Sequence, residues 1–198
     1  MTKQTKYPTK IKAKKVIITI TAALLIAVGC TISLNTKQKD GQMENKANNT
    51  IYLELKDGTV EIELYPEIAP KTVARIIELT NNGFYNGIKF HRVIPGFMAQ
   101  TGDPTGTGMG GSGQNLPAEF NKLSHTRGVV SMARAQDINS ADSQFFIVFD
   151  NASFLDGQYT GFGKVIKGME FVDKIKAGSQ YNNGQVENPD TIIRMYQK

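Results

Sequence analysis

The chain has 198 residues, 40% of them hydrophobic, and a formal net charge of +5. Six of its 23 basic residues lie within positions 1–30, which hold no acidic residue, and this leaves 17 basic residues against 18 acidic ones further on. Beyond position 30 the chain is therefore nearly neutral. Without a cluster of Lys and Arg it lacks the surface of a phosphate-binding protein, and we expect no nucleic-acid partner.

The first 30 residues have the pattern of an export signal. A basic leader precedes an uncharged run at 16–29, which is short for a bilayer span and suits the apolar part of a signal peptide. The only cysteine, Cys30, closes this run. Residues 27–30 resemble the lipobox of bacterial lipoproteins, in which the leader is cut off and the cysteine is lipidated, although Ala27 and Val28 depart from its commoner form. An uncleaved membrane anchor is the alternative.

These patterns predict three segments: a lipoprotein signal peptide at 1–29, a lipidated Cys30 with a flexible tether at 30–50, and a folded domain at 51–198. The tether is rich in Lys, Asn and Gln and has little apolar surface to bury. The domain is large enough for one core, and it has no cysteine for a disulfide. We expect the lipid to hold the protein on the extracytoplasmic face of the cell membrane.

The domain begins with a predicted β-hairpin and a helix. Apolar residues alternate at 51–55 and 60–64, and Asp57-Gly58 supplies a turn. Pro70 suits a first helical position, and apolar residues follow at helical spacing until Asn81-Asn82-Gly83. Further strands are predicted at 90–93, 97–101, 128–132, 144–149, 162–166 and 191–196, and a second short helix at 169–176. This is a mainly β pattern, typical of an antiparallel barrel capped by helices.

Several apparent motifs do not fit their usual functions. Residues 106–111 match G-x-G-x-x-G, but no apolar helix follows, so a flexible loop is expected and no cofactor is predicted. His91 and His125 have no nearby cysteine or paired carboxylates, so we expect no metal site. His91 suits a structural hydrogen-bonding role. Ser131, His125 and Asp137 could form a triad on paper, but nothing resembles a nucleophile elbow, which argues against hydrolysis.

Residues 90–102 are the best candidate for a binding site. They place one guanidinium, one amide and several large apolar side chains on two short β-type runs, joined by a turn at Pro95-Gly96. Polar donors beside an apolar surface suit a binding site. Because no nucleophile has a matched base here, we expect any chemistry to work by holding a substrate in a strained shape.

Residues 90–103, Phe-His-Arg-Val-Ile-Pro-Gly-Phe-Met-Ala-Gln-Thr-Gly-Asp, resemble the signature of cyclophilin-type peptidyl-prolyl cis-trans isomerases. Blocks at 128–133, 142–147, 154–157 and 162–165 agree with that family in the same order. The resemblance spans essentially all of 51–198. It implies a closed eight-stranded antiparallel barrel capped by two helices, and an enzyme that isomerises X-Pro bonds in unfolded or exported proteins.

The resemblance also implies roles for single residues. Arg92 matches the catalytic arginine, which would donate to the prolyl nitrogen as the bond twists, and Gln100 matches a side chain that binds the substrate backbone. The pocket for the proline ring is matched by Phe97, Met98, Phe146 and Leu155. The groove for the preceding residues is matched by Ala133, Gln144 and the backbone around Arg134.

Three residues depart from many eukaryotic members: Phe154 stands in place of tryptophan, Tyr159 in place of histidine and Arg134 in place of asparagine. The loop at 104–114 also differs. Since Phe154 has no indole N–H, we expect weaker binding of the drug cyclosporin. Tyr159 keeps an aromatic wall with a polar tip, so activity is less affected.

Two alternatives to an isomerase remain open. The domain could be a peptide-binding chaperone with little turnover, or a surface module that binds outside partners. Arg92, Gln100 and Phe146 favour the enzyme, because simple binding needs no donor aimed at a twisted nitrogen. We expect a monomer that binds X-Pro segments and reaches the membrane through Cys30.

Overall fold

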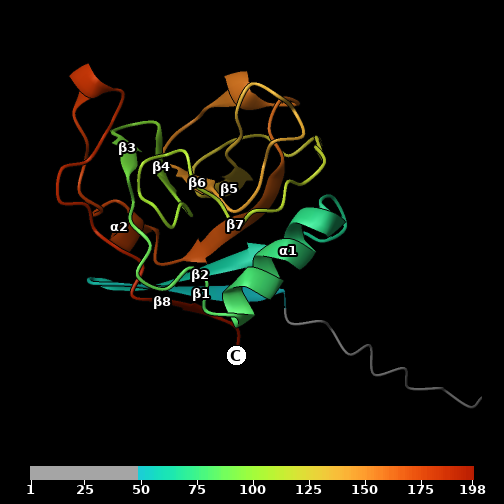
Figure 1. Ribbon diagram of the computed structural model, residues 1–198, viewed down its shortest axis with the longest axis horizontal. Coiled ribbons are helices and arrows are strands. Elements are labelled where there is room, and N and C mark those ends of the chain that lie inside the picture. Colours follow the sequence, from blue (N-terminus) through green and yellow to red (C-terminus); the bar gives the residue numbers. More distant parts are fainter. Residues whose placement is uncertain (1–48) are drawn as a thin grey trace, which may run out of the picture. The chain divides into compact units, whose positions relative to one another are not determined.

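The computed structural model describes residues 49–198; the predicted signal peptide, Cys30 and nearly all of the tether lie outside the described residues. Eight strands form one antiparallel sheet that curls around a core (Figure 1). They are β1 (Thr50–Leu55), β2 (Gly58–Leu64), β3 (Arg92–Ile94), β4 (Met98–Thr101), β5 (Val129–Met132), β6 (Phe145–Val148), β7 (Gly161–Lys167) and β8 (Arg194–Tyr196). Their order in the sheet is β3-β4-β6-β5-β7-β2-β1-β8, which confirms the mainly β prediction.

The β1–β2 hairpin follows the predicted alternation. Ile51 pairs with Ile62 and Leu53 with Val60, and all four side chains are buried on the core face. The turn needs Gly58, because a Cβ atom there would lie 2.5 Å from the ring of Phe171. The hairpin thus packs closely against the short helix α2 (Met169–Val172) that carries Phe171.

Helix α1 (Pro70–Asn81) lies where the sequence predicts it and packs against the β1, β2 and β8 end of the sheet (Figure 1). No side chain of its own caps its first turn. Instead, the carboxylate of Glu119 accepts hydrogen bonds from the backbone N–H groups of Lys71 and Thr72, at 3.0 and 2.8 Å. A carboxylate there satisfies free donors and complements the helix dipole. Helix α2 is shorter than the predicted 169–176 and ends at Val172.

The prediction of a fully closed barrel is wrong. Strands β3 and β8 are the two edges of the sheet, and they do not pair with each other. Irregular segments at 84–91 and 184–193 bridge them: Phe90 N–H donates to Asp190 O and Ile192 N–H to Ile88 O, both at 2.9 Å. The edge strands are three residues long and begin at 92 and 194, later than the predicted 90 and 191. The result is a half-barrel with a hydrogen-bonded seam.

Two apolar clusters lie on opposite faces of the sheet at β6. Phe145 and Ile147 face the main core, whereas Phe146 and Val148 belong to a second cluster with Met98, Val129 and Leu155. Because successive side chains of a strand point to opposite faces, a fully buried strand serves both clusters. Among residues 49–198, no helix is long and apolar enough to cross a membrane.

Candidate active site

The β3–β4 hairpin sets Arg92 and Gln100 side by side. The two residues are directly opposite each other in the strand register, so their side chains share a face. Phe97 N–H donates to Ile94 O at 3.0 Å and closes the turn, where Gly96 has a positive φ of 72°. Arg92 Nη1 donates to Gln100 Oε1 at 3.2 Å. The structure therefore brings together the two residues that the resemblance assigned to catalysis.

Asn183 holds the other side of the Arg92 guanidinium. Arg92 Nε donates to Asn183 O at 3.0 Å, and Nη2 donates to Asn183 Oδ1 at 2.9 Å. Asn183 follows the 3-10 helix η2 (Gln180–Asn182) and has φ of 47°, a conformation that asparagine tolerates. Burial lowers the pKa of Arg92, and Tyr159 acts in the opposite direction. Sequence reasoning missed Asn183.

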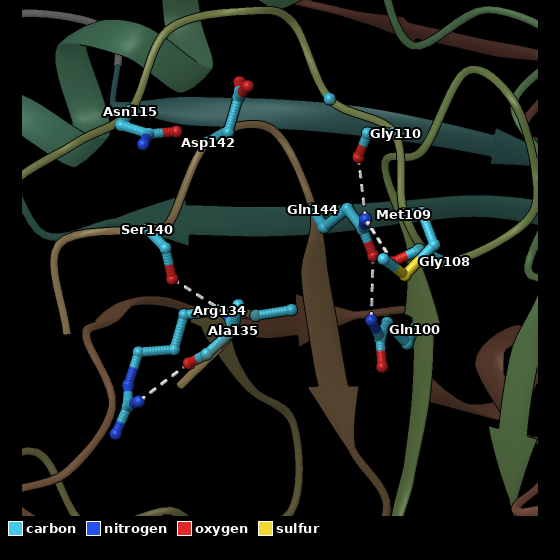
Figure 2. Close-up of a pocket in the computed structure, with 12 residues that line it drawn as sticks. Gln100, Gly108, Met109, Gly110, Asn115, Arg134, Ala135, Ser140, Asp142 and Gln144 are labelled. Atoms are coloured by element: carbon cyan, nitrogen blue, oxygen red, sulfur yellow. Dashed lines mark hydrogen bonds between the residues drawn. The ribbon is translucent and has the colours of Figure 1, made fainter. Parts of the chain in front are cut away.

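A chain of amides continues from Gln100 to the glycine-rich loop. Gln100 Nε2 donates to Gln144 Oε1 at 2.9 Å, and Gln144 Nε2 donates to the carbonyl oxygens of Gly108 and Gly110 at 3.1 and 2.8 Å. Figure 2 shows Gln100 and Gln144 in line with Gly108 and Gly110 of the loop. Because each amide has a defined donor and acceptor, the orientation of Gln100 is fixed from both sides.

Two carboxylates hold the ends of the loop at 103–114, which includes the predicted flexible residues 106–111. Asp103 accepts hydrogen bonds from the backbone N–H groups of Thr105, Thr107 and Gly108. Burial raises the pKa of Asp103, but hydrogen bonds from Thr105, Gly110 and Gly108 outweigh it and bring the pKa to about 2. Asp142 accepts in the same way from residues 112–114.

A pocket of about 370 Å³ opens beside Arg92 and Gln100, and we call it the apolar pocket after its floor. Its floor is the second apolar cluster, with Met98, Phe146 and Leu155 nearly buried. Tyr159 stands edge-on to Phe146, and Phe154, which is 64% exposed, forms the rim with its ring 5.4 Å from that of Phe97. The structure thus brings together the residues that the resemblance assigned to the proline ring.

A second, polar pocket of about 320 Å³ adjoins the apolar one. Figure 2 shows Gln144, Gly108 and Gly110 on one side of it and Arg134 and Ala135 on another. Gln100, Ala133 and Arg134 line both pockets. Of the residues predicted for the groove, Ala133 and Arg134 therefore lie where the two pockets meet, and Gln144 lines the polar pocket alone.

His125 forms a buried hydrogen-bonded chain behind the apolar pocket. Its Nδ1 lies 2.9 Å from Asp156 Oδ1 and its Nε2 lies 3.0 Å from Ser131 Oγ, so the partner carboxylate is Asp156 and not Asp137. Ser131 is 0% exposed, and a substrate cannot reach its hydroxyl. The His125 ring stacks on Phe146 with centroids 6.3 Å apart. This chain supports the pocket wall and cannot act as a hydrolytic triad.

His91 lies beneath the glycine-rich loop, and it does not make the hydrogen bonds that the sequence analysis predicted for it. It is buried, as a structural residue should be, but neither ring nitrogen has a hydrogen-bond partner among the described residues. Burial lowers its pKa, which keeps the ring neutral. Within residues 49–198, no group of three or more His, Cys, Asp or Glu side chains could hold a metal ion.

Comparisons with known proteins agree with this fold and site. The model of the family "Cyclophilin type peptidyl-prolyl cis-trans isomerase/CLD" matches residues 50–197. A probable peptidyl-prolyl cis-trans isomerase of Brucella suis is 51% identical over 187 residues, covering 88% of this chain and 94% of the relative. Peptidyl-prolyl cis-trans isomerase B of Bacillus subtilis is 47% identical over 141 residues, covering 70% of this chain and 98% of the relative.

Solved structures show the same likeness. A cyclophilin type peptidyl-prolyl cis-trans isomerase of Cryptosporidium parvum, crystallised in the presence of the dipeptide Ala-Pro, has a TM-score of 0.69 at 30% identity. The match covers 75% of this chain and 98% of that one. The chain belongs to the cyclophilin-type peptidyl-prolyl cis-trans isomerase family. It is an isomerase of X-Pro peptide bonds, as the sequence predicted.

Proposed function

We propose that catalysis takes place at the junction of Arg92, Gln100 and the apolar pocket, on X-Pro segments of exported proteins. The observation that carries this proposal is the position of the Arg92 guanidinium, which lines the pocket between an apolar floor and the rim. A proline ring seated on Met98 and Phe146 would present its nitrogen near this donor. The Cryptosporidium relative, crystallised with Ala-Pro, supports the same class of ligand.

The chemistry follows from the barrier to rotation. Rotation about the X-Pro bond is slow, with a barrier of about 18–20 kcal/mol, because the nitrogen lone pair is delocalised into the carbonyl. In the twisted state that lone pair becomes a hydrogen-bond acceptor. Arg92 has five N–H donors, of which three bind Asn183 and Gln100, so two remain for the substrate. A bond made mainly in the transition state raises turnover more than it raises affinity.

Gln100 would hold the substrate backbone while the bond rotates. Its oxygen accepts from Arg92, and one of its two amide N–H groups donates to Gln144. The other N–H is available for a substrate carbonyl. Ala133 and Gln144 border the polar pocket, where the residues before the proline would lie. The proline ring and the preceding backbone would each be held still, so that the carbonyl group between them can rotate.

The test of this mechanism is the Arg92→Ala variant of the full-length chain, measured in detergent by a protease-free cis-trans assay. Removal of one such donor typically costs roughly 2–4 kcal/mol of transition-state stabilisation. We expect kcat/KM of Arg92→Ala to fall by the corresponding factor. Arg92→Lys should retain only part of the wild-type kcat/KM, because lysine lacks the planar guanidinium with its paired donors. Turnover near that of the wild type in Arg92→Ala would refute the mechanism. Peptide binding that survives without turnover would support it.

We further propose that the enzyme acts at the membrane surface, held by lipid on Cys30 after cleavage of residues 1–29. The basic leader, the short apolar run and the single cysteine support this. Two or more acyl chains anchor a protein stably, whereas one holds it marginally. The intact mass of the mature chain tests the proposal. A chain that begins at Met1, or at residue 30 without lipid mass, would refute it and leave the isomerase assignment unchanged.

A further inference from the structure

The arginines of the described domain fall into two groups. Residues 49–198 contain five arginines, and three of them form ion pairs: Arg75 with Glu78, Arg127 with Asp173 and Arg194 with Glu54. The other two, Arg92 and Arg134, form no ion pair within this part of the chain, and both line the apolar pocket. The two arginines of residues 49–198 that have no carboxylate partner therefore lie in one place, the substrate groove.

Arg134 is held in position by neutral groups. Its Nε and Nη2 donate to Gln158 O at 3.3 and 3.2 Å, and its Nη1 donates to Ala135 O at 2.9 Å and to Gln136 O at 3.2 Å. The ring of Tyr159 lies 4.8 Å from the guanidinium carbon. These contacts order the side chain without neutralising its charge. One Nη2 N–H is left for a ligand.

Arg134 also stands at the point through which a bound peptide must pass. A third pocket of about 500 Å³, lined in part by Arg92, Asn182, Asn183 and Thr107, adjoins the apolar and polar pockets. Gln100 and Arg134 are the two residues that line all three pockets. Figure 2 shows them across the polar pocket from each other, with the Arg134 guanidinium turned away from Gly108 and Gly110. A chain that runs from the polar pocket to the proline passes between them.

Carboxylates are nearly absent from these surfaces. The residues that line the apolar and third pockets include no acidic side chain. The polar pocket has one, Asp142, and its two oxygens accept hydrogen bonds from residues 112–114. A negative charge on the substrate would therefore meet two guanidinium groups without a carboxylate partner, and the one acidic side chain of these pockets is bound to the backbone of 112–114.

We propose that Arg134, assisted by Arg92, forms a subsite for an acidic side chain on the residue that precedes the proline. This inference rests on the proposed function, since it assumes that the proline ring occupies the apolar pocket. The free N–H of Arg134 Nη2 donates to the carboxylate, and Arg92 adds attraction at longer range. Glu-Pro and Asp-Pro segments are then isomerised faster than segments with a neutral or basic residue before the proline.

The test compares three peptides that differ at one position, Ala-Glu-Pro-Phe, Ala-Gln-Pro-Phe and Ala-Lys-Pro-Phe, with the full-length chain at low salt. Partly exposed ion pairs of this kind change binding by about two- to fivefold. We expect kcat/KM for the Glu peptide to exceed that for the Gln peptide by this factor, and the Lys peptide to fall below both. Added salt should bring the three values together, because it screens the charges.

Two variants assign the preference to Arg134. Arg134→Gln should bring the Glu to Gln ratio close to one, whereas Arg194→Gln, which removes an equal charge from the distant β8, should leave it unchanged. A ratio near one in the wild type, or a ratio that survives in Arg134→Gln, would overturn the proposal. If no peptide is turned over, the proposed function fails instead. Titration of the same peptides would then decide the subsite by their relative affinities.

Discussion

At the scale of single residues, the site depends on neutral partners that orient charged or polar groups. Arg92 is aimed by Asn183 and Gln100, and Gln100 is in turn aimed by Gln144. None of these partners carries a charge, so the guanidinium keeps its full positive charge for the substrate. A carboxylate in the place of Asn183 would hold Arg92 as firmly and would weaken its effect on the prolyl nitrogen.

Replacement of Asn183 by glycine tests this orientation. Glycine tolerates the positive φ and keeps the backbone carbonyl that Arg92 Nε binds, but it removes the Oδ1 acceptor. We expect kcat/KM to fall about fivefold, which corresponds to about 1 kcal/mol for one hydrogen bond. The fully exposed neighbour Tyr181 offers a control, and Tyr181→Ala should keep normal turnover. Unchanged turnover in Asn183→Gly would mean that Arg92 needs no such anchor.

At the scale of elements, hydrogen bonds from a few acceptors organise segments that have little apolar content. Glu119 caps α1 from a distant loop, and Asp103 and Asp142 hold the two ends of the loop at 103–114. This loop forms one wall of the polar pocket. Its shape therefore depends on two acidic side chains that accept its backbone hydrogen bonds, as well as on its glycines.

The depressed pKa of Asp103 predicts a loss of stability in acid. Its pKa is about 2 in the folded protein against an ordinary value of 3.8. The contribution is therefore complete above about pH 4 and disappears as the pH falls through 2, and it is on the order of 2 kcal/mol. Chemical denaturation at several pH values measures this. Asp103→Asn should lose stability at pH 7 and should show a flatter dependence between pH 4 and 2; an equally steep dependence would contradict the assignment.

At the scale of the whole molecule, the sheet is completed by its seam. Asp190 joins three parts there: its side chain pairs with Lys56 Nζ at 3.1 Å and accepts from Lys176 N–H at 2.8 Å, and its carbonyl accepts from Phe90 N–H. These partners come from the β1–β2 turn, from the segment after α2 and from the approach to β3. One aspartate thus connects both edges of the sheet.

Asp190→Ala should loosen the seam before it unfolds the protein. Loss of this half-buried carboxylate removes the acceptor of the Lys176 N–H and the partner of Lys56, and one such hydrogen bond contributes about 0.5–1.5 kcal/mol. Hydrogen exchange should then quicken at Phe90 and Ile192, whose N–H groups cross the seam, while the amides of β5 and β6 remain protected. Asp57→Ala, at the exposed turn beside the same lysine, is the matched control. If exchange quickened equally at Phe90, at Ile192 and in β5 and β6, the seam would not open separately from the rest of the sheet.

The residues of the candidate site could be predicted from the sequence better than whether the barrel closes. Arg92, Gln100 and the apolar wall could be placed because they fall in one short hairpin and in blocks shared with the family. Asn183 and Asp156 could not, because their partners lie 91 and 31 residues away and no local pattern marks such pairs. Closure was mispredicted for a related reason: alternation at 90–93 and 191–196 indicates extended chain but says nothing about whether two extended segments pair.

The covered edges of the half-barrel affect how unfolded chains can associate with the protein. On β3, Val93 N–H donates to Gly184 O and Val93 O accepts from Gly178 N–H; on β8, Met195 N–H donates to Asn86 Oδ1. A free sheet edge is a template for strand addition and aggregation, and here both edges already have partners. An X-Pro substrate is thereby left with the contacts that the groove offers. An isomerase with such edges can release a bound peptide after turnover, because neither edge offers the peptide a strand to extend.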